Sequence, residues 1–306
     1  YISDQRWAKA LEQARRADAV MPKDLERTLL SLRLAELKAK AFAVIYKVEL
    51  EAMDNLENIL NQLETLRRVN PKVVEIRLIR AFIEVYLGRP DDAINELDQA
   101  IEDNPASLLP KMQLVDLYSR LGRFEPAIEL CRKTIKSHPD IFIPYSALAN
   151  VYRAANRPDE ARQALQNAAE ALSDSEKDKA SLALGRLLLT TDQRSEGIRI
   201  LRGLADRLSG DVEVRLRLLA LPEIRQNPDD VNRLLIQIKR IEGETGLQWR
   251  LQQTEAWLRE EHISKYQTQA IDYLNYCIEK DVGWEEPVVT LGQLFERIGE
   301  ENQAEE

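Results

Sequence analysis

The chain has 306 residues, of which 44% are hydrophobic and 31% charged, and its net charge is −9. No stretch approaches the roughly 20 consecutive apolar residues that a membrane helix needs, so the sequence predicts no membrane insertion within this segment. The acidic balance argues against nucleic-acid binding, because a phosphate backbone attracts clustered Lys and Arg.

The first 72 residues predict one partial and one atypical pair of antiparallel helices. Residues 1–22 carry only the apolar spacing of a second helix, and the pair at residues 23–72 has an elongated first helix. The segment from Leu25 to Ala52 lacks Gly and Pro, which predicts one helix about 40 Å long at ~1.5 Å per residue. The far half of this helix either packs on the preceding pair or serves as a docking arm, and both interpretations stay open.

Residues 73–172 repeat themselves with a period of 34, which predicts three regular helix pairs. Several residue types keep this period independently of one another. They are Ala93, Ala127 and Ala161; Pro71, Pro105 and Pro139; Gly88, Gly122 and Asn156; and Arg89, Arg123 and Arg157. A regular period of this kind is typical of a repeat array, in which each helix pair contacts only its neighbours.

The first helix of the pair from Val74 to Ser107 departs from the pattern, because charged residues fall where a core is expected. Those residues are Arg77, Arg80 and Glu84. A shift of one residue restores an apolar stripe of Leu78, Ala81, Phe82 and Val85. The shifted register predicts that Ile79, Ile83 and Tyr86 face a groove, where they form a binding hot spot or contact the long helix.

The remaining residues predict two divergent pairs at 173–246, then a divergent pair and a truncated final one at 247–306. Pro222 falls inside a first helix, and we expect that helix to end early or kink because proline lacks an N–H and clashes with the preceding turn. At the end of the chain, Ala304 opens a second helix that stops at Glu306. Both ends lack polar capping repeats, so we expect a fragment of a longer array, built as one continuous solenoid.

The phased residues resemble the tetratricopeptide repeat family. The pair from residue 142 onward shows the family pattern in both helices, with Tyr145, Leu148, Ala149 and Tyr152 in the first and Ala161, Leu165 and Ala168 in the second. The resemblance covers nearly the whole chain. It implies an all-α fold, a right-handed superhelical solenoid of helix-turn-helix repeats.

Catalytic and metal-binding chemistry find little support in the sequence. The only two histidines, His138 and His262, have no partner at metal-ligand spacing, and no nucleophile or phosphate-binding motif occurs. Cys131 and Cys277 lie at distant packing positions, so we expect two buried thiols that do not pair. Paired acids such as Asp91 and Asp92 fall at helix starts, where the helix dipole favours them. We therefore predict no enzyme activity, no cofactor and no metal, and the cellular compartment remains open.

The resemblance implies that a partner binds along the first helices, at positions offset from the packing stripe. Transferred to this chain, those positions predict a groove lined by apolar and hydrogen-bonding side chains. The predicted groove residues are Leu109, Met112, Asp116, Ser119, Arg120, Ile143, Ser146, Asn150, Arg153, Lys179, Leu182, Arg186 and Leu189.

One subfamily holds the C-terminal carboxylate of chaperones in a Lys, Asn and Arg clamp, and the chain departs from that pattern. Met112 and Ser146 stand where the clamp needs lysine, and Asp116 would repel a carboxylate. We therefore predict no binding of chaperone tails.

Three functions remain after these exclusions. The leading one is a scaffold that binds a protein or peptide in its groove, as similar arrays do in bacterial secretion, envelope assembly and polysaccharide export. The second is a structural spacer or homodimerisation element of a larger enzyme or transporter. The remote third is an RNA-binding helical repeat, a fold of near-identical period.

Overall fold

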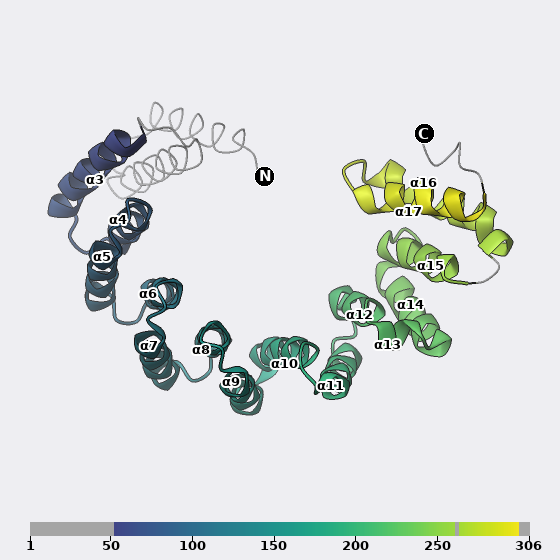
Figure 1. Ribbon diagram of the computed structural model, residues 1–306, viewed down its shortest axis with the longest axis horizontal. Helices are drawn as coiled ribbons and strands as arrows, with labels where there is room; N and C mark the ends of the chain where they lie inside the picture. The colour runs from purple at the N-terminus through teal and green to yellow at the C-terminus, as the bar shows by residue number, and fades with distance from the viewer. Residues whose placement is uncertain (1–51, 261–262, 300–306) are drawn as a thin grey trace. The chain divides into compact units, whose positions relative to one another are not determined.

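The computed structural model describes residues 52–260 and 263–299 (Figure 1). The described residues are helical apart from turns and short connections. They fall into two compact units, which divide between Glu176 and Lys177. The predicted partial pair at 1–22, the long helix over 25–51, His262 and the truncated helix at Ala304 lie outside the described residues. The pair boundaries predicted for the rest of the chain stay predictions.

Unit 1 contains helix α3 and three helix pairs. Its helices are α3 (Ala52–Val69), α4 (Val74–Tyr86), α5 (Pro90–Asp103), α6 (Leu108–Arg120), α7 (Phe124–Ser137), α8 (Phe142–Ala154) and α9 (Pro158–Ala171). The first helices α4, α6 and α8 line one side of the unit, and the second helices α5, α7 and α9 line the other (Figure 1). Each helix packs mainly on the one before and after it in the chain, as expected for a repeat array.

Unit 2 begins in the first turn of helix α10 and continues with further pairs. Its helices are α10 (Asp174–Leu188), α11 (Arg194–Arg207), α12 (Val212–Leu219), α13 (Pro222–Arg225), α14 (Pro228–Glu242), α15 (Gln248–Leu258), the 3-10 turn η1 (Ile263–Tyr266), α16 (Gln267–Lys280) and α17 (Glu285–Arg297). The break predicted at Pro222 is present, because α12 ends at Leu219 and Pro222 starts the separate short helix α13. No described helix is both long and apolar enough to span a bilayer.

Residues with positive φ end the first helices of unit 1. Gly88, Gly122 and Asn156 have φ of 73°, 70° and 58°, the left-handed conformation that follows the last helical turn in a Schellman motif. At Gly122 the next amide, of Arg123, donates back to the carbonyl of Tyr118 at 2.8 Å. The 34-residue period of these residues therefore repeats one chain reversal.

The arginines that share the period join successive pairs. Arg123 pairs with Asp91 at 2.9 Å and Arg157 with Glu125 at 2.8 Å, and Arg89 pairs with Glu57 in the same way. Each partner lies 32 residues before its arginine, so the ion pairs form a ladder along the second-helix side. These side chains are largely exposed, so water screens each pair and it contributes little to stability.

Small residues occupy the points where paired helices come closest. Ala93, Ala127 and Ala161 are fully buried. In unit 2 the same role falls to two glycines on facing helices, since a Cβ on Gly197 would lie 2.7 Å from the carbonyl oxygen of Gly185. The predicted small-residue positions are therefore sites of close helix crossing.

The one-residue shift predicted for α4 is wrong. Ile79 and Ile83 are buried, whereas Phe82 and Val85 are 39% and 40% exposed. Ile79 and Ile83 pack with Leu60 of α3 and its apolar neighbours in one cluster. The unshifted 34-residue register therefore holds through α4.

The charged residues of α4 occupy packing positions because ion pairs from α5 and α3 satisfy them. Glu96 accepts from Arg77 at 3.2 Å and from Arg80 at 2.6 Å. Arg77 also donates to Asp103 at 2.6 Å, and Arg80 lies 3.5 Å from Glu64 of α3. Buried charges need such partners, and here four carboxylate contacts supply them.

Candidate functional site: the exposed face of the first helices

In unit 1 most exposed large apolar side chains lie on the first helices, and the exceptions are Val69 at the end of α3 and Leu121 just after α6. Phe82, Val85 and Tyr86 of α4, Leu109 of α6 and Ile143 of α8 are all at least 39% exposed. Within the described part of the unit, α5, α7 and α9 carry no exposed large apolar residue. Exposed apolar residues gathered on one set of helices mark interaction sites more often than residues scattered singly do.

The predicted groove residues of unit 1 lie on this same face, outside the core. Leu109, Met112, Asp116, Ser119 and Arg120 belong to α6. Ile143, Ser146, Asn150 and Arg153 belong to α8. Each of these nine side chains is exposed or half-buried.

Local contacts hold several of the polar groove residues in place. Arg120 Nε lies 2.8 Å from Asp116 Oδ2, one helical turn earlier. On α8, Arg153 Nη1 donates to Asn150 Oδ1 at 3.5 Å. The Asp116 and Arg120 charges neutralise each other, whereas Arg153 has no carboxylate partner among the described residues.

A pocket of about 370 Å³ opens between α4 and α6 and joins predicted residues to residues that the sequence analysis missed. Met112, Asp116 and Arg120 line it from α6, and Leu78, Phe82 and Val85 line it from α4. Its volume lies at the lower end of the roughly 300–1,000 Å³ typical of ligand pockets. The α4 side was missed because the wrong register placed Leu78, Phe82 and Val85 in the core.

Of the predicted groove residues of unit 2, the two charged ones lie outside the core, whereas Leu182 and Leu189 pack against the core cluster. Lys179, Leu182 and Arg186 belong to α10, and Leu189 follows its end. Lys179 and Arg186 are exposed, and Leu182 and Leu189 are half-buried.

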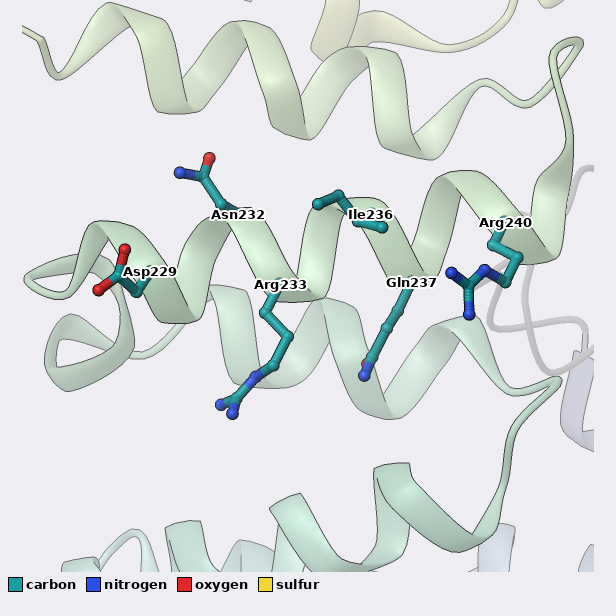
Figure 2. A pocket seen from close by; sticks show the side chains of 6 residues that line it. All are labelled: Asp229, Asn232, Arg233, Ile236, Gln237 and Arg240. Atoms are coloured by element: carbon teal, nitrogen blue, oxygen red, sulfur yellow. The ribbon is translucent and has the colours of Figure 1, made fainter.

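A second pocket, of about 430 Å³, lies along the exposed face of α14 in unit 2. Its lining residues are Asp229, Asn232, Arg233, Ile236, Gln237 and Arg240. Figure 2 shows that all six come from the one helix, with Asn232 on one side of it and Arg233 and Gln237 on the other. The hollow is therefore a strip of one helix surface, in which Ile236 is the apolar element at 61% exposure.

Comparison with known proteins decides the family. Two tetratricopeptide repeat models match the chain, one over residues 85–151 and one over residues 146–211. Residues 85–211 of the chain are tetratricopeptide repeats. The matched residues run from the last two residues of α4 in unit 1 to Asp211 in unit 2, and they include helices α5 to α11.

One solved structure supports the tetratricopeptide repeat fold at low sequence identity, and two more match with lower TM-scores. The C-terminal part of a TPR repeat-containing protein from Cytophaga hutchinsonii has a TM-score of 0.50 and 11% identity, over 83% of this chain and 99% of that chain. Yeast Tom70 has a TM-score of 0.49 and 14% identity, over 89% and 58% of the two chains. A tetratricopeptide repeat protein from Parabacteroides merdae has a TM-score of 0.45 and 15% identity, over 76% and 89%. No curated protein sequence matches the chain.

The tetratricopeptide repeats support a protein-interaction scaffold as the general role of the chain. The two cysteines are consistent with packing positions in such repeats, since Cys131 and Cys277 are buried and unpaired. Burial raises the pKa of the Cys131 thiol to about 12 and that of Cys277 to about 11, so both thiols are protonated and unreactive at neutral pH. Across the described residues, no group of three His, Cys, Asp or Glu side chains could hold a metal ion.

Proposed function

We propose that the chain is a non-catalytic scaffold that binds a segment of a protein partner along the first helices α4, α6 and α8. The observation that carries the proposal is the one-sided distribution of exposed apolar side chains in unit 1. Val85, Leu109 and Ile143 are exposed on first helices, whereas the second helices α5, α7 and α9 expose only polar and small residues. Burying this surface against a partner would stabilise the complex, because apolar side chains would be removed from water.

Polar residues on the same face suit an extended peptide. The Asn150 amide is exposed and can both donate to and accept from a peptide main chain. Ser146 lies one turn before it on α8 and offers a hydroxyl group. A partner segment would thus meet apolar contacts and main-chain hydrogen bonds on one surface. On the family resemblance alone, the proposal extends to a bacterial secretion, envelope-assembly or polysaccharide-export system.

The test is capture of partners from lysate of the source organism by the whole chain and by a groove variant. The variant carries Met112→Ala, Asp116→Ala, Asn150→Ala and Arg153→Ala, all at exposed or half-buried positions. A matched control carries Lys133→Ala, Lys136→Ala, Gln163→Ala and Asn167→Ala, four exposed residues of the second helices α7 and α9. Equal helicity by circular dichroism ensures that the three chains are compared in the folded state.

We expect the control to retain the partners of the unmodified chain and the groove variant to lose them. Partners that both variants retain would place binding outside α6 and α8 and contradict the proposal. Failure of all three chains to capture a protein would favour the spacer function. A dimeric mass by light scattering would then point to self-association.

A further inference from the structure

Three of the exposed or half-buried positions on α4, α6 and α8 change from apolar to polar along the array, whereas Leu109 and Ile143 stay apolar and exposed at another position of α6 and α8. Three positions on each helix recur with the 34-residue period, and all nine side chains are exposed or half-buried. The residues are Leu78, Phe82 and Val85 on α4; Met112, Asp116 and Ser119 on α6; and Ser146, Asn150 and Arg153 on α8. The α4 set is wholly apolar, the α6 set is mixed, and the α8 set is wholly polar.

The pocket lies at the apolar end of this gradient. Leu78, Phe82 and Val85 form its α4 wall, and Met112 and Leu117 are the apolar residues that line it from α6. Leu97 of α5 also lines it, and the ion-paired Asp116 and Arg120 complete the α6 side. A bulky apolar side chain fits a hollow of about 370 Å³ lined in this way. Such anchors, seated in a pocket, supply most of the affinity of protein interfaces.

The polar end of the gradient carries an uncompensated positive charge. Arg120 is paired with Asp116 at 2.8 Å, whereas Arg153 bonds only to the neutral Asn150 amide among the described residues. In a chain of net charge −9, this local cation selects for an acidic group on the partner, because complementary charge sets specificity at interfaces.

We propose that the groove of unit 1 recognises an extended protein segment with a bulky apolar residue and, about four residues away, an acidic residue. The apolar side chain enters the pocket between α4 and α6, and the carboxylate pairs with Arg153 on α8. Packed helices lie roughly 8–10 Å apart, so the pocket between α4 and α6 lies about one and a half spacings, or roughly 12–15 Å, from α8. An extended chain rising about 3.3 Å per residue spans this distance in about four residues. This inference rests on the proposed function and specifies the sequence that the same surface selects.

The test is selection of a displayed library of random twelve-residue peptides on the whole chain. Enriched sequences are then synthesised with a fluorescent label, and their affinities are measured by anisotropy. We expect the enriched peptides to share a bulky apolar residue and an Asp or Glu at the stated spacing.

Two substitutions separate the apolar contact from the charged one. Val85→Asp places a charge in the pocket wall and should weaken binding about ten-fold or more, as loss of an interface anchor does. Val288→Asp is the matched control, because Val288 is 53% exposed on α17 of unit 2 and Val85 is 40% exposed on α4. Arg153→Glu should weaken binding of acidic peptides about five-fold and turn the preference toward basic ones. Arg240→Glu, at an exposed arginine of α14, is its control.

The possible failures are distinguishable. Selected peptides that bind Val85→Asp and Arg153→Glu as tightly as the unmodified chain would overturn this inference, as would the absence of any enriched peptide. The proposed function is judged separately, by the loss or retention of lysate partners in the groove variant. If the groove variant loses its partners but the selected peptides lack the apolar and acidic pattern, the scaffold function is supported and the proposed recognition sequence is wrong.

Discussion

The Tyr145 hydroxyl on α8 donates to the carbonyl oxygen of Pro139, 3.1 Å away in the preceding turn. The same bond recurs one repeat earlier, where Lys111 Nζ on α6 donates to the carbonyl oxygen of Pro105 at 2.5 Å. Both donors are the fourth residue of a first helix, and both acceptors lie six residues before them. A polar tip on a long side chain thus fixes the turns that lead into α6 and α8.

Unit 2 uses other side chains for the same contact. Arg215 of α12 donates to the carbonyl oxygen of Leu208 at 2.8 Å, and Trp249 of α15 donates through Nε1 to that of Gly243 at 3.1 Å. Lys, Tyr, Arg and Trp have in common only a long side chain and an N–H or O–H donor. What these positions share is therefore the hydrogen bond and not the residue type. A pattern of residue types alone does not reveal it.

Removing this bond should loosen the turn between α7 and α8. We expect Tyr145→Phe to lower the free energy of unfolding by about 1 kcal/mol, because Tyr145 is buried and loses one hydrogen bond. Urea unfolding followed by circular dichroism measures the change. Tyr276→Phe is the control, since no hydrogen bond joins its hydroxyl to another described residue, and equal midpoints for the two variants would contradict the expectation.

The ion cluster of α4 and α5 should respond strongly to loss of its central carboxylate. Glu96→Gln leaves Arg77 and Arg80 without the charge they share at 3.2 and 2.6 Å. Because all three side chains are at most 16% exposed, we expect a loss of about 3 kcal/mol. Glu102→Gln, at an exposed position of α5, should change stability by less than about 0.5 kcal/mol.

A compensated variant tests whether this loss comes from stranded charge. Replacing the cluster with Arg77→Met, Arg80→Met and Glu96→Leu should recover most of the stability, since buried ion pairs are often no better than apolar residues of similar size. If the triple variant were as unstable as Glu96→Gln, packing and not charge would be the cause. Both results come from the same urea titrations.

The sequence predicts the helix pairs of this fold well, because the period, the caps and the small residues are local signals. It fails for α4, where hydropathy alone rejects Arg77 and Arg80 as packing residues. Their partners, Glu96 and Glu64, lie on α5 and α3, so the compensation is a tertiary contact that no local pattern contains. The simple 34-residue period is the better guide to the register.

The residues of the candidate site are likewise predicted on α6 and missed on α4. Met112 and Asp116, which the family pattern predicts to face a groove, line the pocket. The prediction misses Phe82 and Val85, because a one-residue shift rotates the assigned helix face by about 100° and places them in the core. Carrying the period back from Asp116 and Ser119 identifies both.

The Glu64 carboxyl predicts how unit 1 responds to acid. A bidentate hydrogen bond from Arg67, helped by Arg68 and Arg80, lowers the pKa of Glu64 to about 2. A folded-state pKa below the unfolded value stabilises the fold above the unfolded pKa, and this contribution is lost as pH falls through the folded pKa. The relevant window therefore runs from about pH 4.5 down to about pH 2.

Glu64→Gln should be less stable than the unmodified chain at neutral pH, and the difference should shrink as pH falls through that window. Urea midpoints of both chains at several pH values measure it. Glu75→Gln, at an exposed carboxyl on α4, is the control and should show a smaller difference at neutral pH. A Glu64→Gln difference of constant size down to about pH 2 would show that the Arg67 contact does not act through ionisation.

The same Gly→Ala substitution should have opposite effects at two glycines of the array. Gly122 has φ of 70°, and a Cβ added to it would meet no atom within 4 Å, so Gly122→Ala meets only backbone strain and should cost about 1–2 kcal/mol. Gly203 also has open space around it, but it lies inside helix α11 without positive φ. Gly203→Ala should therefore stabilise the chain by about 0.5–1 kcal/mol, because alanine loses less backbone entropy in a helix.

Gly122→Asn should cost less than Gly122→Ala, since Asn156 adopts φ of 58° at the equivalent position one repeat later. Urea unfolding of the three variants measures these differences, and a stabilising Gly122→Ala would refute the left-handed turn after α6.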